Sequence, residues 1–432
     1  MAGDGKHGRK SCSEGRAEGR AESGFESCSE GRAEGGSKNG TPAHDLALFE
    51  RYPQLVGELP WVPLGTFPTP VERMGRLSKR LGSEVWVKRD DLSGAIYGGN
   101  KVRKLELVLA EAIESGARRV WTMGGTGSHQ VLATALYARE LGLGCAAVVF
   151  PQPVTPHVRE VLSAIVEAGC ELVPAAHMFT VPAASARLMA RRGWGWELGE
   201  RGGGGRGGAG SWGRGGKEGG PLKLKQRGRF IGGAFPIPPG SSSPTGALGY
   251  VSAALELAEQ IREGACPMPG AIVTAYGSAG TAAGLLVGLR LAGLDVPVYA
   301  VRVVLKALGT RGRLAGLATD TAALLRRLGV PAPGGFARDD MRVVEDQVGA
   351  GYGHVTREAE EAVSLAAEDG IRLETTYTGK ALAGLCALVR DRRPGWGRVL
   401  FWNTFHSRTL GRTLPDAEIL RRLPRALRSV LS

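Results

Sequence analysis

The sequence predicts an α/β protein in which parallel sheets are covered by helices. First, short apolar runs typical of buried strands alternate with longer segments of helical spacing. Second, Gly-rich bends join several of these runs directly to the following helix. Third, 432 residues with 43% hydrophobic side chains can bury a large core and fill two or three domains. Together these observations favour repeated β-α-β units.

The predicted elements follow in chain order. Val85-Trp86-Val87 has the apolar character of a buried strand, and a helix follows it after a Gly-rich bend. The same rhythm then repeats along the chain. Strands are predicted at 85–87, 119–123, 145–150, 171–174, 271–275, 297–303 and 399–402, and helices at 101–115, 128–141, 157–168, 246–263 and 281–292.

Two segments break the rhythm. Residues 1–45 are polar, repeat Ser-Cys-Ser-Glu-Gly-Arg-Ala-Glu-Gly at 11–19 and 27–35, and are too poor in apolar side chains to fold, so we expect disorder. The second segment is an insertion at about 193–228, and 15 of its first 28 residues are glycine. Its Arg and Trp side chains could bind single-stranded RNA, whereas the simpler interpretation is a flexible surface loop.

Composition excludes several classes of protein. No apolar run is long enough to span a membrane, and no apolar segment at the N-terminus resembles a secretory signal. The six cysteines include no C-x-x-C pair, so we expect neither a disulfide framework nor a metal site, and a reducing cytoplasmic setting fits best. The net charge of +13 suggests nucleic acid, but residues 186–230 hold 11 basic and 3 acidic residues, so +8 comes from one stretch.

The first chemical motif is Gly98-Gly99-Asn100-Lys101, which lies between a predicted strand and helix. The partial positive charge of the helix N-terminus favours the neutral amine of Lys101. A neutral amine can form a Schiff base with an aldehyde. The alternative is an ordinary solvated lysine.

Two further Gly-rich bends lie between strands and helices. Gly277-Ser278-Ala279-Gly280-Thr281 could direct backbone N–H groups at an anion, and a single phosphate group fits better than a nucleotide because no Gly-Lys-Ser/Thr follows. Its alternative is a tight turn packed through glycines. Ser128, in Gly127-Ser128-His129, could be a helix N-cap that also leaves N–H groups free for a substrate carboxylate.

Two motifs near the C-terminus supply polar side chains. Tyr377 precedes Gly379-Lys380 and could place a phenol beside a substrate, or could be a half-buried packing residue. Thr404 follows the apolar strand at 399–402, and ligands of open α/β sheets gather at such strand ends. The alternative there is a plain turn.

Seen together, these motifs resemble the D-cysteine desulfhydrase / 1-aminocyclopropane-1-carboxylate deaminase family, which are pyridoxal-phosphate enzymes of the tryptophan-synthase-β fold (fold type II). The resemblance covers roughly residues 60–430 apart from the insertion. The matching segments occur in the family's order. They are Gly98–Lys104, Ile237-Pro238 with Gly246–Tyr250, Gly277–Thr281 and Tyr377–Lys380.

The resemblance implies a role for each residue. Lys101 would hold pyridoxal 5'-phosphate as a Schiff base, with Asn100 beside it. The segment Gly277, Ser278, Ala279, Gly280 and Thr281 would bind the phosphate, and Thr404 would lie beside the pyridine nitrogen. Ser128, Tyr352 and Tyr377 would contact the substrate.

Two departures from the family pattern place the substrate in question. The family follows its serine with Asn-His, whereas this chain has His129-Gln130, so His129 would have to support the cofactor hydroxyl instead of the usual Asn. The family also has Thr-Gly-Gly where this chain has Thr404-Phe405-His406, and these two bulky side chains could reshape the pocket.

The resemblance favours β-elimination from a small amino acid. Desulfhydrases carry Tyr-Thr-Gly-Lys where this chain has Tyr377-Thr378-Gly379-Lys380, whereas ring-opening deaminases carry Tyr-Glu-Gly-Lys. D-cysteine would give pyruvate, sulfide and ammonia, with Lys101 as the base at Cα. The alternatives are 1-aminocyclopropane-1-carboxylate deamination to 2-oxobutanoate, a cofactor-binding protein with little catalysis, and an RNA-associated protein.

The resemblance also implies two α/β domains with the cofactor in the cleft between them. The larger would combine 46–97 with 236–432, and the smaller would cover 98–235 with the insertion. A homodimer without membrane contact is expected.

Overall fold

The structure, a computed structural model of the chain, describes residues 46–192, 195–196, 230–231, 233–391, 396–406 and 416–431. The expected disorder of residues 1–45 and nearly all of the insertion at 193–228 lie outside these residues. Within the described ranges, no helix combines the length and the apolarity that crossing a membrane requires.

The larger of two main sheets has six strands in the order β1-β2-β12-β9-β10-β11. All neighbours are parallel except β1 and β2, so the predicted parallel sheet carries one antiparallel edge strand that the sequence did not predict. β1 is a three-residue edge strand, and only residues 74–83 connect it to β2, which is shorter than the dozen or more residues that a parallel crossover needs. The strands are Val71–Arg73 (β1), Glu84–Lys88 (β2), Arg398–Trp402 (β12), Ala271–Tyr276 (β9), Val298–Arg302 (β10) and Arg342–Val344 (β11).

The second sheet has four parallel strands in the order β5-β4-β3-β8. They are Glu171–Pro174 (β5), Gly144–Phe150 (β4), Arg119–Gly125 (β3) and Ala234–Pro236 (β8). Gly195–Trp196 (β6) and Phe230–Ile231 (β7) form a separate antiparallel pair. The two main sheets confirm the predicted α/β class, while the domain boundaries at 97/98 and 235/236 stay predictions.

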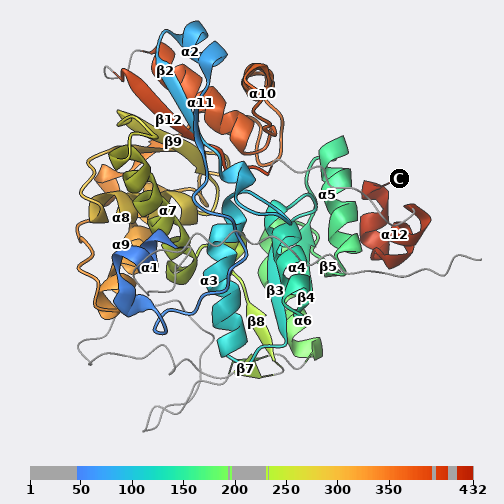
Figure 1. Cartoon of the computed structure of the whole chain (residues 1–432). Coiled ribbons are helices and arrows are strands. Elements are labelled where there is room, and N and C mark those ends of the chain that lie inside the picture. The colour runs from blue at the N-terminus through green and yellow to red at the C-terminus, as the bar shows by residue number, and fades with distance from the viewer. Residues whose placement is uncertain are drawn as a thin grey trace, which may run out of the picture. The chain divides into compact units, whose positions relative to one another are not determined.

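Helices cover both faces of the sheets (Figure 1). Every predicted element is present with ends within two residues of those expected, and shorter elements appear in addition. The helices are Ala47–Arg51 (α1), Gly75–Leu81 (α2), Asn100–Glu114 (α3), His129–Glu140 (α4), Pro156–Glu167 (α5), Val181–Arg192 (α6), Pro244–Arg262 (α7), Gly280–Leu291 (α8), Arg311–Arg327 (α9), Arg357–Glu368 (α10), Thr378–Arg390 (α11) and Asp416–Arg422 (α12).

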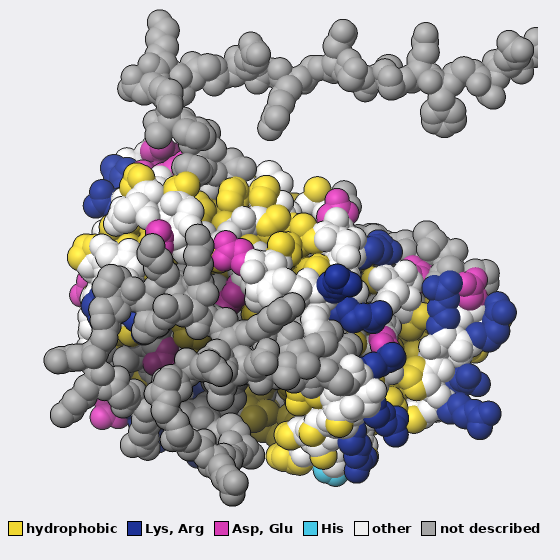
Figure 2. Space-filling model, turned by 90° about the horizontal axis from the view of Figure 1, so that it is seen from below, with side chains coloured by type: hydrophobic (Ala, Val, Ile, Leu, Met, Phe, Trp, Pro, Cys, Tyr) yellow, Lys and Arg dark blue, Asp and Glu magenta, His cyan; other side chains and the backbone are white. Residues whose placement is uncertain are grey.

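The side chains of β12 point alternately to the two faces of the larger sheet, so this strand contributes to two hydrophobic cores. Leu400 and Trp402 pack into a cluster with α7, α8 and α9, whereas Val399 and Phe401 pack into a cluster with α2, α10 and α11. Successive strand residues point to opposite faces, so a continuous apolar run fills both sides. In the view of Figure 2, most of the visible Lys and Arg side chains gather toward one side of the surface.

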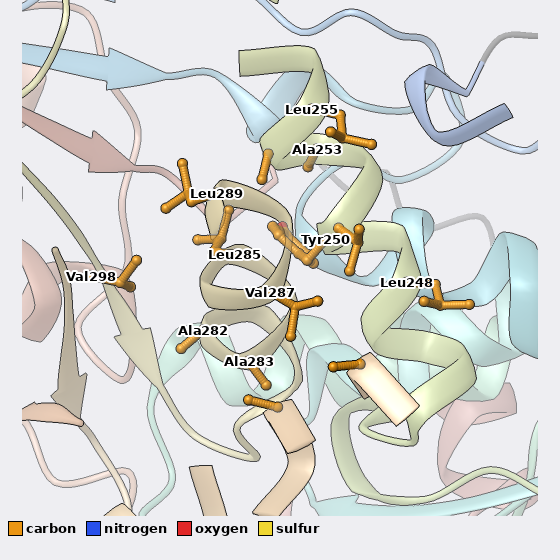
Figure 3. Close-up of a cluster of buried hydrophobic side chains, with 14 of the residues drawn as sticks. Leu248, Tyr250, Ala253, Leu255, Ala282, Ala283, Leu285, Val287, Leu289 and Val298 are labelled. Carbon is orange, nitrogen blue, oxygen red and sulfur yellow. The ribbon is translucent and has the colours of Figure 1, made fainter. Parts of the chain in front are cut away.

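Helices α7 and α8 pack against each other in the core (Figure 3), and glycines of α8 allow their close approach. A Cβ on Gly288 would lie 2.6 Å from the Ala254 side chain and 2.7 Å from the Val251 carbonyl oxygen, so only glycine fits at that point. Leu285, Val287 and Tyr250 fill the surrounding core. This contact holds α8 against α7, and the first turn of α8 borders the cavity described below.

A buried network of charges joins β2, α3 and α7. The Glu256 carboxylate accepts hydrogen bonds from Lys88 Nζ at 2.5 Å and Arg103 Nη1 at 2.8 Å. Arg103 Nη2 also donates to Asp90 Oδ1 at 2.8 Å, and Trp402 Nε1 donates to Asp90 Oδ2 at 2.7 Å. Buried charges need such partners, and this network anchors α3 against the strand ends.

Candidate active site

A cavity of about 320 Å³ lies where strand ends of both main sheets meet the helices that follow them. Its walls come from the start of α3, the β3–α4 and β9–α8 bends, and the residues after β12. All twelve residues predicted from the sequence as site residues line it. They are Asn100, Lys101, Ser128, His129, Gly277, Ser278, Ala279, Gly280, Thr281, Tyr352, Tyr377 and Thr404.

The bend before α3 positions Lys101. Gly99 has φ of +88°, and a Cβ there would lie 2.7 Å from the Phe405 carbonyl oxygen and 2.8 Å from that of Thr404. The backbone N–H of Asn100 donates to the same Thr404 oxygen at 3.2 Å. Glycine is therefore required for α3 to begin directly against the end of β12.

The amine of Lys101 is half-buried in the cavity wall. Its Nζ donates to Asn100 Oδ1 at 2.6 Å. Burial lowers the pKa of Lys101 to about 8, and the negative charge of Glu374 partly opposes this shift. The sequence predicted a shift in this direction from the helix N-terminus, but the main cause is removal of the amine from water.

The bend between β9 and α8 forms a cradle opposite Lys101. Ala279 has φ of +78°, a conformation that is costly for a residue with a Cβ. Gly280 begins α8, and its N–H donates to Ser242 Oγ at 3.1 Å. Thr281 Oγ1 accepts from Asn100 Nδ2 at 2.9 Å, so Asn100 joins the cradle to the lysine.

Sequence reasoning missed a second lysine at this cradle. Lys104 lies one helical turn after Lys101, and its Nζ would be 2.9 Å from a Cβ placed on Gly280. It donates to the Gly240 carbonyl oxygen at 3.2 Å. Burial, and then the charge of Lys101, hold the pKa of Lys104 well below its ordinary value. The three-residue spacing from Lys101 was the available signal, since residues at i and i+3 share a helix face.

Two tyrosines form another part of the wall. The hydroxyls of Tyr352 and Tyr377 are hydrogen-bonded at 2.7 Å. Burial raises the pKa of Tyr352 to about 12, although its hydrogen bond with Tyr377 opposes this, so the phenol is neutral at pH 7. The Tyr377 ring lies against the cradle, because a Cβ on Gly277 would be 3.2 Å from its Cε1.

Glu374 also lines the cavity, although the sequence motifs gave no reason to predict a role for it. Its carboxylate accepts backbone N–H groups of Thr376 at 2.6 Å, Tyr377 at 2.8 Å and Thr378 at 2.9 Å. These bonds cap the start of α11 in the manner of an N-terminal carboxylate. Glu374 thereby fixes Tyr377 and places a negative charge at the cavity.

The three remaining predicted residues occupy the bends after β3 and β12. Ser128 is an N-cap, since its Oγ accepts from the Val131 N–H at 3.4 Å, and it also lines the cavity. Thr404 is half-buried. His129 faces Tyr97, His157 and the two bulky side chains Phe405 and His406, which are buried at 5% and 2% exposure.

This set of donors fits a phosphorylated aldehyde. The Lys101 amine, easily deprotonated, can bond to an aldehyde carbon. The cradle of Gly277–Thr281, with positive φ at its alanine and Lys104 beside it, matches a phosphate group. A side chain at Gly280 would collide with Ser242 and Lys104, so the space is kept open.

Comparisons with known proteins agree with this chemistry. Residues 62–404 match the family described as pyridoxal-phosphate dependent enzyme. D-cysteine desulfhydrase of Salmonella choleraesuis (strain SC-B67) is 31% identical over 369 residues, which is 84% of this chain and 96% of the relative. The D-cysteine desulfhydrase of Salmonella newport (strain SL254) shows the same identity and coverage.

Solved structures show the same fold. A crystal structure of an ACC deaminase homologue superposes with a TM-score of 0.64 at 27% identity, covering 88% of this chain and all of that one. A fungal L-serine ammonia-lyase from Rhizomucor miehei superposes with a TM-score of 0.50 at 21% identity, covering 83% and 98%. The second likeness concerns the fold alone.

Proposed function

The chain belongs to the pyridoxal-phosphate dependent enzymes, and from this premise we propose that it catalyses β-elimination from a small amino acid, with D-cysteine as the favoured substrate. The products would be pyruvate, sulfide and ammonia. The D-cysteine desulfhydrases that are 31% identical over 84% of the chain support this choice.

One observation carries the proposal. Asn100 bonds Lys101 Nζ through its carbonyl oxygen and Thr281 Oγ1 through its amide nitrogen. A single side chain therefore holds the amine and the phosphate cradle in one arrangement. Lys101 would hold the aldehyde end of the cofactor, and the segment 277–281 with Lys104 would hold its phosphate.

When bound, pyridoxal phosphate supplies the electron sink that makes the Cα proton of an amino acid acidic. The Lys101 amine would remove that proton, because a pKa of about 8 leaves a useful neutral fraction near pH 7. Ser128 and the N–H groups at the start of α4 would hold the substrate carboxylate. Thr404 would face the pyridine nitrogen with a neutral hydroxyl, which favours elimination over transamination.

The C-terminal wall supports elimination of a β leaving group over ring opening. Thr378 stands where ring-opening deaminases carry Glu, and its hydroxyl lies 3.2 Å from Glu374 Oε1. Tyr352 and Tyr377 would present their neutral hydroxyls to the substrate. The bulk of Phe405 and His406 restricts the space beside the ring, which favours a small substrate.

Ring-opening deamination is the second candidate, and the structural likeness to an ACC deaminase homologue favours it. Turnover of 1-aminocyclopropane-1-carboxylate to 2-oxobutanoate would support it over elimination. A cytoplasmic homodimer also belongs to the proposal, and sedimentation of the purified protein would test the dimer.

The deciding experiment is visible absorbance of the purified protein and of Lys101→Ala, before and after D-cysteine is added. We expect a yellow wild type, a variant without that absorbance, and pyruvate and sulfide from the wild type alone. A yellow protein that leaves D-cysteine unchanged would reject this substrate and keep the cofactor and Lys101. A protein that cannot be reconstituted with pyridoxal phosphate would overturn the proposal.

A further inference from the structure

A chain of side chains leads from the cavity toward solvent beside Lys101. Tyr97, which lines the cavity, places its hydroxyl 2.5 Å from His129 Nδ1. His129 Nε2 lies 2.9 Å from His157 Nε2. His157 Nδ1 lies 3.7 Å from Glu160 Oε2, and these last two side chains are 27% and 30% exposed. That last gap suits one bridging water or a small side-chain rotation.

We propose that Tyr97, His129 and His157 form a hydrogen-bonded relay that carries a proton between Glu160 at the surface and the cavity. Two imidazole Nε2 atoms 2.9 Å apart share one proton, since one ring must donate and the other accept. Imidazole has a nitrogen at each end, so a ring can accept a proton on one side and release one on the other.

The transfer balances atom by atom. A proton that Glu160 takes up from solvent joins His157 Nδ1, and the Nε2 proton of His157 passes to His129 Nε2. The Nδ1 proton of His129 passes to the Tyr97 oxygen, whose own proton enters the cavity. Tyr97 and the two histidines end neutral, each ring has changed tautomer, and Glu160 is left without the proton that it took up from solvent. After the transfer each group donates its hydrogen bond toward the surface, from Tyr97 to His129 and from His129 to His157. The original tautomers return when the hydroxyl and the rings exchange protons with solvent.

Aromatic rings pack around the inner part of this path. The Phe405 ring meets His129 edge-on at 5.3 Å between centroids and His157 at 5.8 Å, while His406 stacks on Tyr97 at 4.4 Å. Burial lowers the pKa of His129 well below its ordinary value and raises that of Tyr97, so both are neutral in the resting protein. The family's Asn at position 129 could form hydrogen bonds but could not change tautomer.

Several charged or titratable groups face the relay from neighbouring elements. Lys101, His406 and Arg372 oppose a positive charge on His129, and Glu374, Tyr137 and Glu160 oppose a negative charge on Tyr97. The relay is therefore suited to concerted transfer of a proton through neutral groups, with no ion resting on it.

The use of this proton rests on the proposed function. As the Cα–H electrons form the Cα–Cβ double bond, the Cβ–S bond breaks and its electron pair stays on sulfur. The proton released by Tyr97 would join that sulfur, so hydrogen sulfide leaves. Lys101 holds the Cα proton, which departs with the product ammonia as ammonium.

The test compares wild-type holoenzyme with His157→Gln, Glu160→Gln and the matched control His177→Gln, an exposed histidine outside the cavity. Glutamine keeps a hydrogen bond but cannot relay a proton. With D-cysteine, we expect His157→Gln to lower kcat about 10- to 100-fold with KM and cofactor absorbance unchanged, and added imidazole to restore part of the loss. Glu160→Gln, on the surface, should lower kcat less and alter its pH profile.

A second readout needs no substrate. In holoenzyme labelled with ¹⁵N-histidine, the shared proton should give a scalar coupling between two Nε2 nuclei, lost in His157→Gln and kept in His177→Gln. Absence of that coupling from the wild type would overturn the relay, as would an unchanged kcat in His157→Gln. If the wild type does not turn over D-cysteine, the proposed function fails and the coupling alone decides on the relay.

Discussion

The side-chain amide of Asn100 donates a hydrogen bond to the hydroxyl of Thr281 across 2.9 Å, although 181 residues separate them in the chain. Asn100 begins α3 and Thr281 lies in the first turn of α8. The starts of two helices from different parts of the chain are thus tied at the cavity. This one connection therefore links the adjacent Lys101 to the cradle at 277–281.

We therefore predict that Asn100→Leu and Thr281→Val each weaken pyridoxal-phosphate binding by about tenfold or more, at least the size of one lost hydrogen bond. The double variant should bind the cofactor little more weakly than Asn100→Leu alone, because Asn100→Leu already removes the bond that Thr281→Val removes. Equilibrium dialysis of the cofactor measures this. Thr319→Val, at an exposed threonine on α9, is the control and should bind normally. If the losses of cofactor affinity in the two single variants added up fully in the double variant, the two residues would not act through one hydrogen bond.

The pKa of about 8 at Lys101 predicts how pH governs cofactor capture. The neutral amine is the nucleophile, so the rate of capture by cofactor-free protein should rise about tenfold per pH unit below pH 8 and level off above it. Stopped-flow absorbance gives the rate, and borohydride reduction followed by peptide mapping should locate the label on Lys101, not Lys104. If the capture rate kept rising with pH up to pH 10.5, the ordinary pKa of lysine, burial would not be lowering the pKa of Lys101.

Glu256→Gln should destabilise the fold by about 3–5 kcal/mol, because the buried Lys88 would lose its carboxylate partner and Arg103 would lose one of its two. Burial alone would raise the pKa of Glu256, but Arg103 and Lys88 outweigh it and hold the pKa at about 2, against an ordinary 4.5. The stabilisation is therefore fully present above about pH 4.5 and is lost as pH falls toward 2.

Urea unfolding of wild type and Glu256→Gln at pH 7 and pH 3 measures both effects, and the difference between them should shrink at pH 3. Glu361→Gln is the matched control, since the exposed Glu361–Arg357 pair should contribute only about 0.3–0.5 kcal/mol. If Glu256→Gln and Glu361→Gln lowered the free energy of unfolding equally, the buried network would not contribute more than an exposed ion pair.

The order of strands and helices was predictable because each buried strand is an apolar run and each helix has apolar spacing. Short elements escaped: β1, β8 and β11 have three residues each, too few to show a period. The antiparallel pairing of β1 with β2 depends on contacts between strands, which a pattern along one strand does not reveal.

In the candidate site, too, features of one short segment were predictable from the sequence, and features that depend on tertiary contacts were not. The place of Lys101 and of residues 277–281 in the cavity wall was predictable, because each lies in a short Gly-rich bend between a strand and a helix. The pairing of His129 with His157 depends on the packing of α5 against α4, and that of Tyr352 with Tyr377 on two loops 25 residues apart. Such proximity comes from the tertiary fold. The low pKa of Lys101 comes from burial, which local sequence also does not specify.

The last prediction concerns the tyrosine pair. In Tyr377→Phe the ring stays against Gly277, but the hydroxyl that contacts Tyr352 at 2.7 Å is lost. Because both phenols lie in the cavity wall and Tyr352 is neutral at pH 7, we expect cofactor absorbance to persist while kcat on D-cysteine falls about 100-fold. Tyr299→Phe, away from the cavity, should keep full activity. A fall in cofactor absorbance equal to the fall in kcat would instead show that Tyr377 acts by holding the cradle, since its ring and the loop at Gly277 are in contact.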